Sequence, residues 1–381
     1  MKKVLILSSE VFTDLTIEKK REFQNFINEN IKNGNKIVFT SREASKKAEL
    51  NEIEFNSNVF FIQRDTLVNM IKEVFKTKDD YYFIVIGTKD HDLYLASTNK
   101  LFFVYPNWCK EPQEKAQKYG FKVTNIRGLK LLVDIIENQQ SWYFKLELDE
   151  KTTVLGLTNA GTYGRHSQEE LEMIRAFRAI LKDGEKNLYK VLLVHFLAAI
   201  SSNNEFREIK DWGIMPSSGT ELNKDMLDFK EKARILMYGK KEAPIFLRHT
   251  KTFKSHDPQN KDKDRIPCDR HFETIQINPA YKGKLKNRVV CIFDDYTTNG
   301  TTFETARNLL LKENVKKVFF VSLGKFGNGY YQQDYKITGN TTEKNGYKYE
   351  LLNRKKRHDF FIEKKAIREI ESLHDLIYAK K

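Results

Sequence analysis

The chain has 381 residues, of which 40% are hydrophobic and 31% are charged, and its formal net charge at pH 7 is +14. This length predicts two domains, and the apolar content is ample for packed cores. We expect no membrane-spanning segment, because the longest apolar stretch, Val191–Ile200, is far shorter than the roughly 20 residues of a membrane span.

The cysteines and the N-terminus favour a cytoplasmic protein. Cys109, Cys268 and Cys291 are isolated from one another in the sequence, so we expect neither a disulfide framework nor a zinc site. The apolar run in Met1–Leu7 is too short for a signal peptide. We therefore expect a soluble protein in a reducing compartment.

The positive charge is concentrated after residue 150. Residues 1–150 carry 23 Lys and Arg against 22 Asp and Glu, whereas the rest of the chain carries 43 against 30. Such an excess attracts anions, whether diphosphates or nucleic acid, and charge alone does not distinguish the two.

Residues 1–145 have the pattern of a small parallel α/β domain. Short apolar runs that predict strands alternate with helical periodicity. The expected strands are Val4–Leu7, Lys36–Phe39, Val59–Ile62, Tyr82–Ile86 and Leu101–Val104, and the expected helices are Glu18–Ile31, Thr66–Phe75 and Leu93–Thr98.

Three stretches of this part resemble the haloacid-dehalogenase-like (HAD-like) phosphohydrolases. Ile37–Arg42 is similar to the second motif of that family, and Gly87–Ala96 is similar to its acidic motif, which implies that Asp90 and Asp92 help to hold Mg²⁺. In the first motif, Ser8 stands where the family has its nucleophilic Asp, and Glu10 stands at the acid/base position. Without a carboxylate nucleophile the aspartyl-phosphate route is closed, so we expect the fold without phosphatase activity, as a ligand-sensing or docking module. The alternative is an α/β domain whose Asp90 and Asp92 only cap a helix.

The segment Glu137–Glu150 mixes glutamine, serine and aromatic residues, which predicts a short, partly packed connection to a second domain that covers residues 150–381. There we expect an edge strand at Thr153–Leu157, helices at Ser167–Leu181 and Leu188–Ile200, and a strand at Trp212–Met215. His195, on the apolar face of its helix, is more typical of a core histidine than of a catalyst.

A Ser/Gly-rich turn that precedes a helix from about Asn223 to Tyr238 is a candidate anion-binding loop. It consists of Ser217, Ser218, Gly219 and Thr220. Backbone N–H groups in such a turn suit an anion, although a plain turn is the alternative.

A long polar segment, Arg248–Pro279, follows the expected strand Ala243–Leu247 and includes another at Ile275–Ile277. A segment of this length in a compact domain is typical of a functional loop or of disorder. Fixed cations stabilise the charge that develops on a leaving group, so four basic residues are candidates to clamp a diphosphate, the alternative being a solvated loop. They are Arg248, Lys254, Arg265 and Arg270.

The most informative stretch is Arg288–Leu311. An apolar strand, Val289–Phe293, is followed by two carboxylates, Asp294 and Asp295, and then by a turn of small and hydroxyl residues that leads into a helix. The turn consists of Thr297, Thr298, Asn299, Gly300, Thr301 and Thr302. The N–H groups at the start of the helix suit a phosphate, and the carboxylates suit sugar hydroxyls or a hard cation.

Ile292–Phe303 resembles the phosphoribosyl-diphosphate (PRPP) signature of type I phosphoribosyltransferases. The resemblance implies that Asp294 and Asp295 contact the ribose hydroxyls and the PRPP-bound Mg²⁺, and that Thr297–Thr302 wrap the 5-phosphate. It further implies that Ser217–Thr220 bind the diphosphate and that the polar segment closes over the substrate. Asn299 departs from the usual residue, and an ordinary strand-to-helix loop remains the alternative.

The order of these segments is most similar to ComF-like transferases. After the expected strand Val315–Leu323, a Gly- and Tyr-rich extension begins near residue 324 and includes the basic Asn353–His358 and an amphipathic helix, Phe361–Tyr378. We therefore expect an α/β protein of two domains: a HAD-like (Rossmannoid) parallel sheet, and a type I phosphoribosyltransferase-like parallel sheet with a helical and basic extension.

The resemblance implies an enzyme that transfers ribose 5-phosphate from PRPP to a nitrogenous base, or that runs the reverse or hydrolytic reaction on a nucleotide, with the acceptor base unidentified. The alternative is a non-catalytic module that senses PRPP or nucleotides for a partner. The basic cluster makes a nucleic-acid partner conceivable, although short charged runs are usually solvated.

Overall fold

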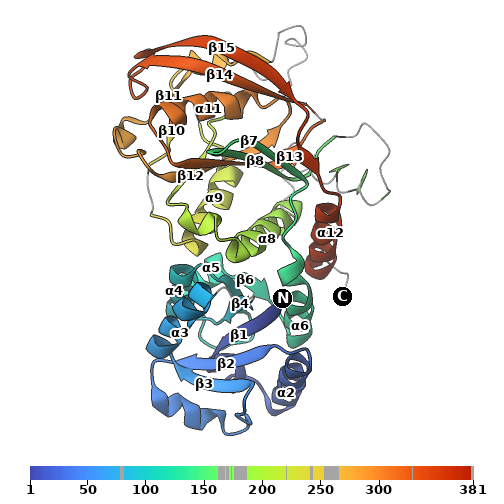
Figure 1. Ribbon diagram of the computed structural model, residues 1–381. Helices are drawn as coiled ribbons and strands as arrows, with labels where there is room; N and C mark the ends of the chain where they lie inside the picture. Colours follow the sequence, from blue (N-terminus) through green and yellow to red (C-terminus); the bar gives the residue numbers. More distant parts are fainter. Residues whose placement is uncertain are drawn as a thin grey trace.

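The computed structural model describes residues 1–77, 81–161, 168, 171–172, 174–175, 187–219, 221–240, 243–252, 266–327 and 329–378. Thr220, Lys254, Arg265 and most of the helix expected at Ser167–Leu181 lie outside these residues. The α/β class expected from the sequence is confirmed: the described residues form two six-stranded sheets with helices packed around them (Figure 1).

The first sheet is parallel throughout and has the strand order β3-β2-β1-β4-β5-β6. Its strands are β1 (Lys2–Ser8), β2 (Lys36–Ser41), β3 (Val59–Gln63), β4 (Tyr81–Ile86), β5 (Phe102–Pro106) and β6 (Phe121–Val123). The helices α2 (Ile17–Lys32) and α6 (Ile126–Ile135) lie to one side, and α3 (Arg64–Thr77), α4 (Asp90–Asn99) and α5 (Glu114–Tyr119) lie to the other. The short helix α1 (Glu10–Thr13) follows β1 directly.

The second sheet is mixed, which corrects the expectation of a purely parallel one. Its order is β16-β7-β8-β13-β12-β9, in which β8, β13, β12 and β9 are parallel and β7 is antiparallel to both of its neighbours, β8 and β16. The bounds are β7 (Phe144–Asp149), β8 (Thr152–Asn159), β9 (Asp211–Ile214), β12 (Val289–Thr297), β13 (Lys317–Lys325) and β16 (Phe361–Ile362). The strand expected at the edge is β8, which is instead paired on both sides and buried throughout.

Helices cover both faces of the second sheet. On the side of the first sheet lie α8 (Asn187–Ser202) and α9 (Lys224–Leu236), and α11 (Thr301–Lys312) lies on the other side (Figure 1). Two short strands, β10 (Phe246–Arg248) and β11 (Ile275–Ile277), pair antiparallel, and a short helix, α10 (Asp269–Phe272), precedes β11.

The C-terminal extension, which was expected to be helical and basic, contains a β-hairpin in addition to its helix. It begins with the antiparallel pair β14 (Tyr330–Gly339) and β15 (Tyr347–Arg357), which lies over α11, and ends with α12 (Lys365–Tyr378) beside α8 and α6. The basic residues Arg354, Lys355 and Lys356 are exposed on β15.

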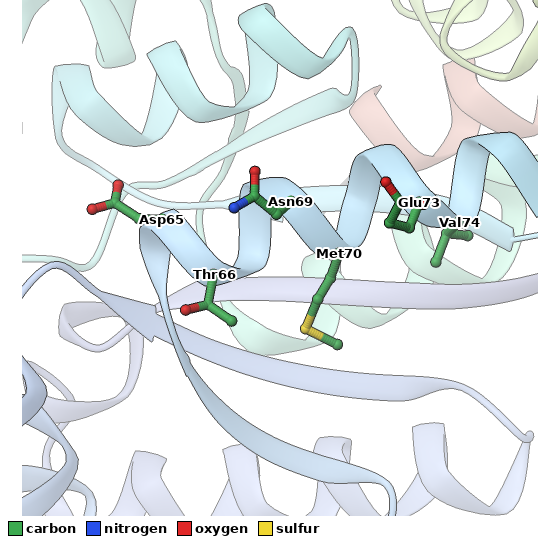
Figure 2. Close-up of a pocket in the computed structure, with 6 residues that line it drawn as sticks. All are labelled: Asp65, Thr66, Asn69, Met70, Glu73 and Val74. Carbon is green, nitrogen blue, oxygen red and sulfur yellow. The ribbon is translucent and has the colours of Figure 1, made fainter.

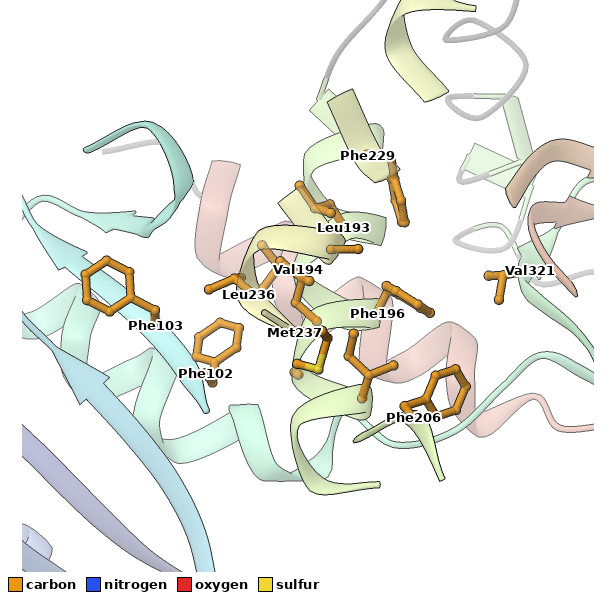
Figure 3. Close-up of a cluster of buried hydrophobic side chains, with 14 of the residues drawn as sticks. Phe102, Phe103, Leu193, Val194, Phe196, Phe206, Phe229, Leu236, Met237 and Val321 are labelled. Atoms are coloured by element: carbon orange, nitrogen blue, oxygen red, sulfur yellow. The ribbon is translucent and has the colours of Figure 1, made fainter. Parts of the chain in front are cut away.

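The hydrophobic core runs without interruption between the two sheets. Side chains of α8 and α9, among them Leu193, Phe196 and Leu236, lie between Phe102 of β5 and Val321 of β13 (Figure 3). Tyr82 of β4 donates a hydrogen bond to the carbonyl of Ala198, at 3.2 Å. The division into two domains stays a prediction, because the helices of the second half are packed against the first.

None of the helices in the described part of the chain combines the length and the apolar character that a membrane span requires.

Candidate functional site

The strand β12 carries the carboxylate pair to the carboxyl edge of the second sheet. Val289–Phe293 is buried between β9 and β13, because a parallel strand in the middle of a sheet has helices on both faces. Asp294 and Asp295 come next and are half-buried. This edge is where ligands of open parallel sheets usually bind.

The two carboxylates are adjacent at the end of β12, and each accepts a hydrogen bond from the backbone N–H of the next residue. Oδ1 of Asp294 accepts from the N–H of Asp295 at 3.0 Å, and Oδ1 of Asp295 accepts from the N–H of Tyr296 at 2.8 Å. Burial, followed by the charge of Asp295, raises the pKa of Asp294 well above its usual range, and the charge of Arg248 acts in the opposite direction. A bound cation or hydroxyl donors would relieve this repulsion.

The turn after the pair leads into α11 through a glycine in a left-handed conformation. Gly300 has φ +85° and is the N-cap of α11. A Cβ at this position would lie 2.4 Å from the ring of Tyr330, so both the conformation and the space demand glycine. In the described structure the N–H groups of Thr302 and Phe303, in the first turn of α11, have no acceptor.

The turn is held in place by Lys325, a residue that the sequence analysis missed. Nζ of Lys325 donates to the carbonyl oxygens of Thr298, Phe326, Gly327 and Gly329, at 2.8–3.0 Å. Burial lowers the pKa of Lys325 to about 7, whereas the four carbonyl oxygens favour its charged form. The sequence did offer one signal for this residue: Lys325 is a lysine at the carboxyl end of an apolar strand, β13.

A buried ion network holds β14 on α11. Oε2 of Glu304 accepts from Arg307 at 2.8 Å and from the N–H of Gln333 at 2.9 Å, and Oε1 accepts from the hydroxyl of Tyr330 at 2.8 Å. The N–H of Tyr331 donates to the carbonyl of Asn299 at 2.9 Å. The hairpin thereby supports the turn at Asn299 and Gly300.

The Ser/Gly loop lies on the neighbouring strand, at the same edge. The N–H of Met215, directly after β9, donates to the carbonyl of Phe293 at 2.8 Å, so the loop starts beside Asp294. The hydroxyl of Ser217 donates to the carbonyl of Glu221, at 2.6 Å. The side chain of Asn223 caps α9 by accepting from the N–H groups of Asp225 and Met226, so an anion here would be bound by Ser217, Ser218 and Gly219 and not by the helix N-terminus.

Arg248 contacts the Ser/Gly loop, and its charge lowers the pKa of Asp294. It lies at the end of β10 and is 6% exposed. Its Nε donates to the carbonyl of Ser217 at 2.5 Å, and its Nη1 donates to the hydroxyl of Thr274. Burial, together with the charge of Arg270, lowers its pKa to about 10.

Arg270 lies close to Arg248, with His271 between them. The distance from Nε of Arg270 to Nε2 of His271 is 3.2 Å, and that from Nη2 of Arg248 to Nδ1 is 3.3 Å. A neutral imidazole has one acceptor nitrogen, so it accepts from one of the two guanidinium groups. Burial and both arginines lower the pKa of His271 well below its usual range, which keeps the ring neutral.

Asp90 and Asp92 lie together after β4 but already have partners in the protein. Asp92 forms an ion pair with Arg64 at 2.6 Å and accepts from the N–H groups of Thr88 and Lys89, both at 3.1 Å. Oδ1 of Asp90 accepts from the N–H of Lys115 at 3.0 Å, at the start of α5. No group of three or more His, Cys, Asp or Glu with metal-site geometry occurs within the described residues, and the metal role of this pair stays a prediction.

A separate open pocket of about 510 Å³ lies on α3 and contains none of the predicted site residues. It is lined by Asp65, Thr66, Asn69, Met70, Glu73 and Val74 (Figure 2). Its lining comes from one face of a single helix, so it offers no convergent set of polar groups of the kind that defines a ligand site.

Comparisons with protein-family models, with curated proteins and with solved structures give no match to this chain.

Proposed function

We propose that the protein is a Mg²⁺-dependent phosphoribosyltransferase that uses PRPP. The observation that supports this best is the arrangement at the carboxyl edge of β9 and β12. A carboxylate pair lies between two loops with anion-binding character, and Arg248 contacts one loop while its charge acts on Asp294.

The two loops suit the two ends of PRPP. The turn Thr298–Thr302 offers a left-handed glycine, hydroxyl groups and the N-terminus of α11 to the 5-phosphate. The loop Ser217–Gly219, supported by Arg248, faces the diphosphate, and the carboxylate pair receives the ribose hydroxyls between them. Parallel strands are about 4.8 Å apart, so the starts of the two loops are within reach of one small molecule.

The donor set fits a substrate-bound Mg²⁺. Mg²⁺ is usually held by one or two carboxylates together with oxygens of a phosphate substrate. Asp294 and Asp295 supply the carboxylates, and a bound cation would offset the burial and the charge of Asp295, which together raise the pKa of Asp294. When bound, the ion would neutralise charge on the departing diphosphate.

The protein contributes positioning and electrostatics to the transfer. Arg248 stabilises the negative charge that develops on the diphosphate as the bond to C1 of the ribose breaks. The turn and the carboxylates hold the ribose phosphate so that a nitrogen of the acceptor reaches C1. Position 298 in the turn is a threonine, so no carboxylate there can act as a general base. The acceptor must therefore react through a nitrogen that is already nucleophilic.

A non-catalytic module that binds PRPP or a nucleotide is the second candidate. It is favoured by the first sheet, where Ser8 ends β1 in place of a nucleophilic carboxylate. A first sheet without a catalytic nucleophile, combined with a ligand site on the second sheet, suits a sensor.

One assay separates the candidates: incubation with PRPP, Mg²⁺ and a panel of bases and nucleotides, with release of diphosphate as the readout. Turnover with one acceptor supports the transferase. Saturable PRPP binding without diphosphate release supports the sensor, and the absence of both excludes the site.

A further inference from the structure

The outer strand of the C-terminal hairpin has a free edge. β14 packs on α11 and pairs with β15, and in the described part of the chain no strand pairs with the other side of β15 (Figure 1). Residues 350–356 of β15 are all exposed. The unpaired edge of a strand presents a row of backbone N–H and C=O groups, to which a further strand can add.

The hydrogen bonds of β14 show which backbone groups of β15 point outward. The N–H groups of Tyr331, Gln333 and Tyr335 donate to acceptors in α11 or in the turn before it, at 2.9 Å each. They therefore point away from β15, so each of these residues belongs to a pair without ladder hydrogen bonds, and its opposite residue directs its own N–H and C=O groups away from β14. The opposite residues, in the same order, are Lys356, Arg354 and Leu351.

These outward groups have no backbone partner in the described part of the chain. Leu352 lies between them without an opposite residue on β14, so it is the extra residue of a β-bulge. The free edge is defined here as the outward side of β15 from Leu351 to Lys356.

Both ends of β15 are fixed to the rest of the protein. The hydroxyl of Tyr347, at its start, donates to the carbonyl of Ile275 at 2.6 Å. The guanidinium of Arg357, at its end, donates to the carbonyls of Glu147 at 3.0 Å and Leu148 at 2.9 Å. An edge held in this way loses little conformational freedom when a strand adds to it.

The free edge is basic. Arg354, Lys355 and Lys356 are consecutive and exposed, and none of them forms an ion pair with a described residue. Nε of Arg354 donates to Oε1 of Gln333 at 3.2 Å, which is a neutral partner. The one acidic residue of β15 is Glu350. A ligand that carries negative charge is therefore favoured at this edge.

The free edge also carries two exposed apolar side chains. Leu351 is 42% exposed and Leu352 is 62% exposed. Apolar surface is stabilised when another chain removes it from water.

These three features together select one class of partner. A nucleic acid would use the cations, but its phosphates have no donors for the outward carbonyl oxygens and no apolar surface for the leucines. A second copy of the chain would bring the same cations to the same edge, and like charges opposite each other are destabilising. An acidic polypeptide in an extended conformation uses the cations, the backbone groups and the leucines.

We propose that the free edge of β15 binds an extended, acidic segment of a partner protein as an added strand. The backbone of this segment pairs with Leu351, Arg354 and Lys356. Arg354 and Lys356 are two residues apart and lie on the same face of the strand, so the segment carries acidic residues at alternate positions opposite them. The surface is separate from the carboxylate pair of β12, and the proposal goes beyond the transferase reaction.

The test uses the full chain and a fluorescent heptapeptide in which glutamate and valine alternate. Its binding is followed by fluorescence anisotropy, and hydrogen exchange of residues 348–357 gives a local readout. The peptide should bind and should slow exchange in this range, whereas the counterpart with lysine in place of glutamate should not bind. The same acidic peptide with every backbone amide N-methylated keeps its charge but cannot donate to the edge, so its affinity should fall about tenfold or more.

Two replacements of Lys356 separate strand pairing from charge. Lys356→Pro removes an N–H that points to the free edge, and proline is tolerated there because no bond to β14 is lost. Lys356→Ala removes the same charge and keeps the N–H. The acidic peptide should bind K356P about tenfold more weakly than K356A.

A charge reversal tests the same edge without proline. In K355E/K356E the acidic peptide should lose its binding, and the lysine peptide should bind instead. K282E/K284E is the matched control, because it makes the same change in charge at two exposed lysines after β11. It should bind the acidic peptide as the wild-type protein does.

Equal affinity of K356P and K356A, or of the methylated and unmethylated peptides, would show that charge acts without strand pairing and would overturn the proposal. A wild-type protein that binds a single-stranded oligonucleotide but not the acidic peptide would overturn it as well, and would assign the basic strand to nucleic acid. The transferase assay uses PRPP and diphosphate, so its outcome is independent of this one.

Discussion

Gly300 is the residue whose replacement tests the turn most selectively. Its φ of +85° is unfavourable for any side chain, and a Cβ would collide with Tyr330 at 2.4 Å. We expect Gly300→Ala to cost more than the 1–2 kcal/mol that left-handed strain alone imposes, and to abolish PRPP binding because Asn299 and Thr301 move. Urea denaturation and calorimetric titration measure the two effects.

Gly283 supplies the control for this variant. It has φ +69°, and nothing lies within 4 Å of an added Cβ. Gly283→Ala should therefore show the strain without the collision, at about 1–2 kcal/mol, with PRPP binding intact. Equal effects of the two replacements on binding would contradict the assignment of the turn.

His195 makes stability depend on pH. The ring is fully buried, with Nδ1 2.9 Å from Oε1 of Gln139 and Nε2 3.0 Å from the carbonyl of Ser141. Burial lowers its pKa from 6.5 to about 4, so the unfolded chain binds the proton more readily. Stability should fall by about 3 kcal/mol as the pH drops from 6.5 to 4.

The variant His195→Gln isolates this contribution, because other acids titrate in the same range. Its free energy of unfolding should be lower at pH 7 but should change less between pH 6.5 and pH 4 than that of the wild-type protein. Identical pH profiles by urea denaturation would show that His195 does not account for the change.

Lys325 links two secondary-structure elements, because it connects the end of β13 to the turn after β12. Lys325→Met leaves buried carbonyl oxygens without their donor, and each such loss costs about 1–3 kcal/mol. We expect a clear loss of stability and weaker binding of PRPP. Lys317→Met, at the other end of β13, is the control, since its partner Glu205 is exposed and surface pairs contribute little. A loss of PRPP affinity in both variants would refute the role of Lys325.

The sequence predicted the elements that have a buried face. Apolar runs located β1, β2, β4, β12 and β13, because a strand covered on both faces is apolar along its length. The turn at Gly300 was located as well, since its conformation admits few residue types. The functions assigned to these residues stay predictions.

The elements that were missed depend on contacts distant in sequence. In β7, alternate residues are buried, but the mixture of charges in Phe144–Asp149 suggested a connection. The central place of β8 follows from its pairing with β13, where Gly156 meets Ser322, and no local pattern reveals this. The strand β15 is exposed on both faces over most of its length, so it has no hydrophobic period to detect.

At the scale of the whole molecule, the shared core predicts one cooperative unfolding transition. Arg207 joins the halves: its guanidinium donates to the carbonyls of Asn99 at 2.9 Å and Ser201 at 3.3 Å, and it lies 3.9 Å from the ring centre of Phe75. Arg207→Ala should lower stability by about 2–4 kcal/mol, and the calorimetric transition should stay single because the shared core remains.

Lys316→Ala is the control for Arg207, because Lys316 pairs with Glu208 on the surface and its side chain is 59% exposed. It should leave the transition single. Two transitions in the wild-type protein would show instead that the sheets unfold independently.

The central claim is that the turn after Asp294 and Asp295 binds a ribose phosphate that these carboxylates hold, and calorimetric titration with PRPP and Mg²⁺ tests it most directly. The wild-type protein should bind one PRPP, and D294N/D295N should lose this binding while its melting temperature is kept. Asp228→Asn, at a half-exposed carboxylate on α9 that pairs with Lys232, should bind as the wild-type protein does. PRPP affinity that is the same in D294N/D295N and in the wild-type protein would contradict the account.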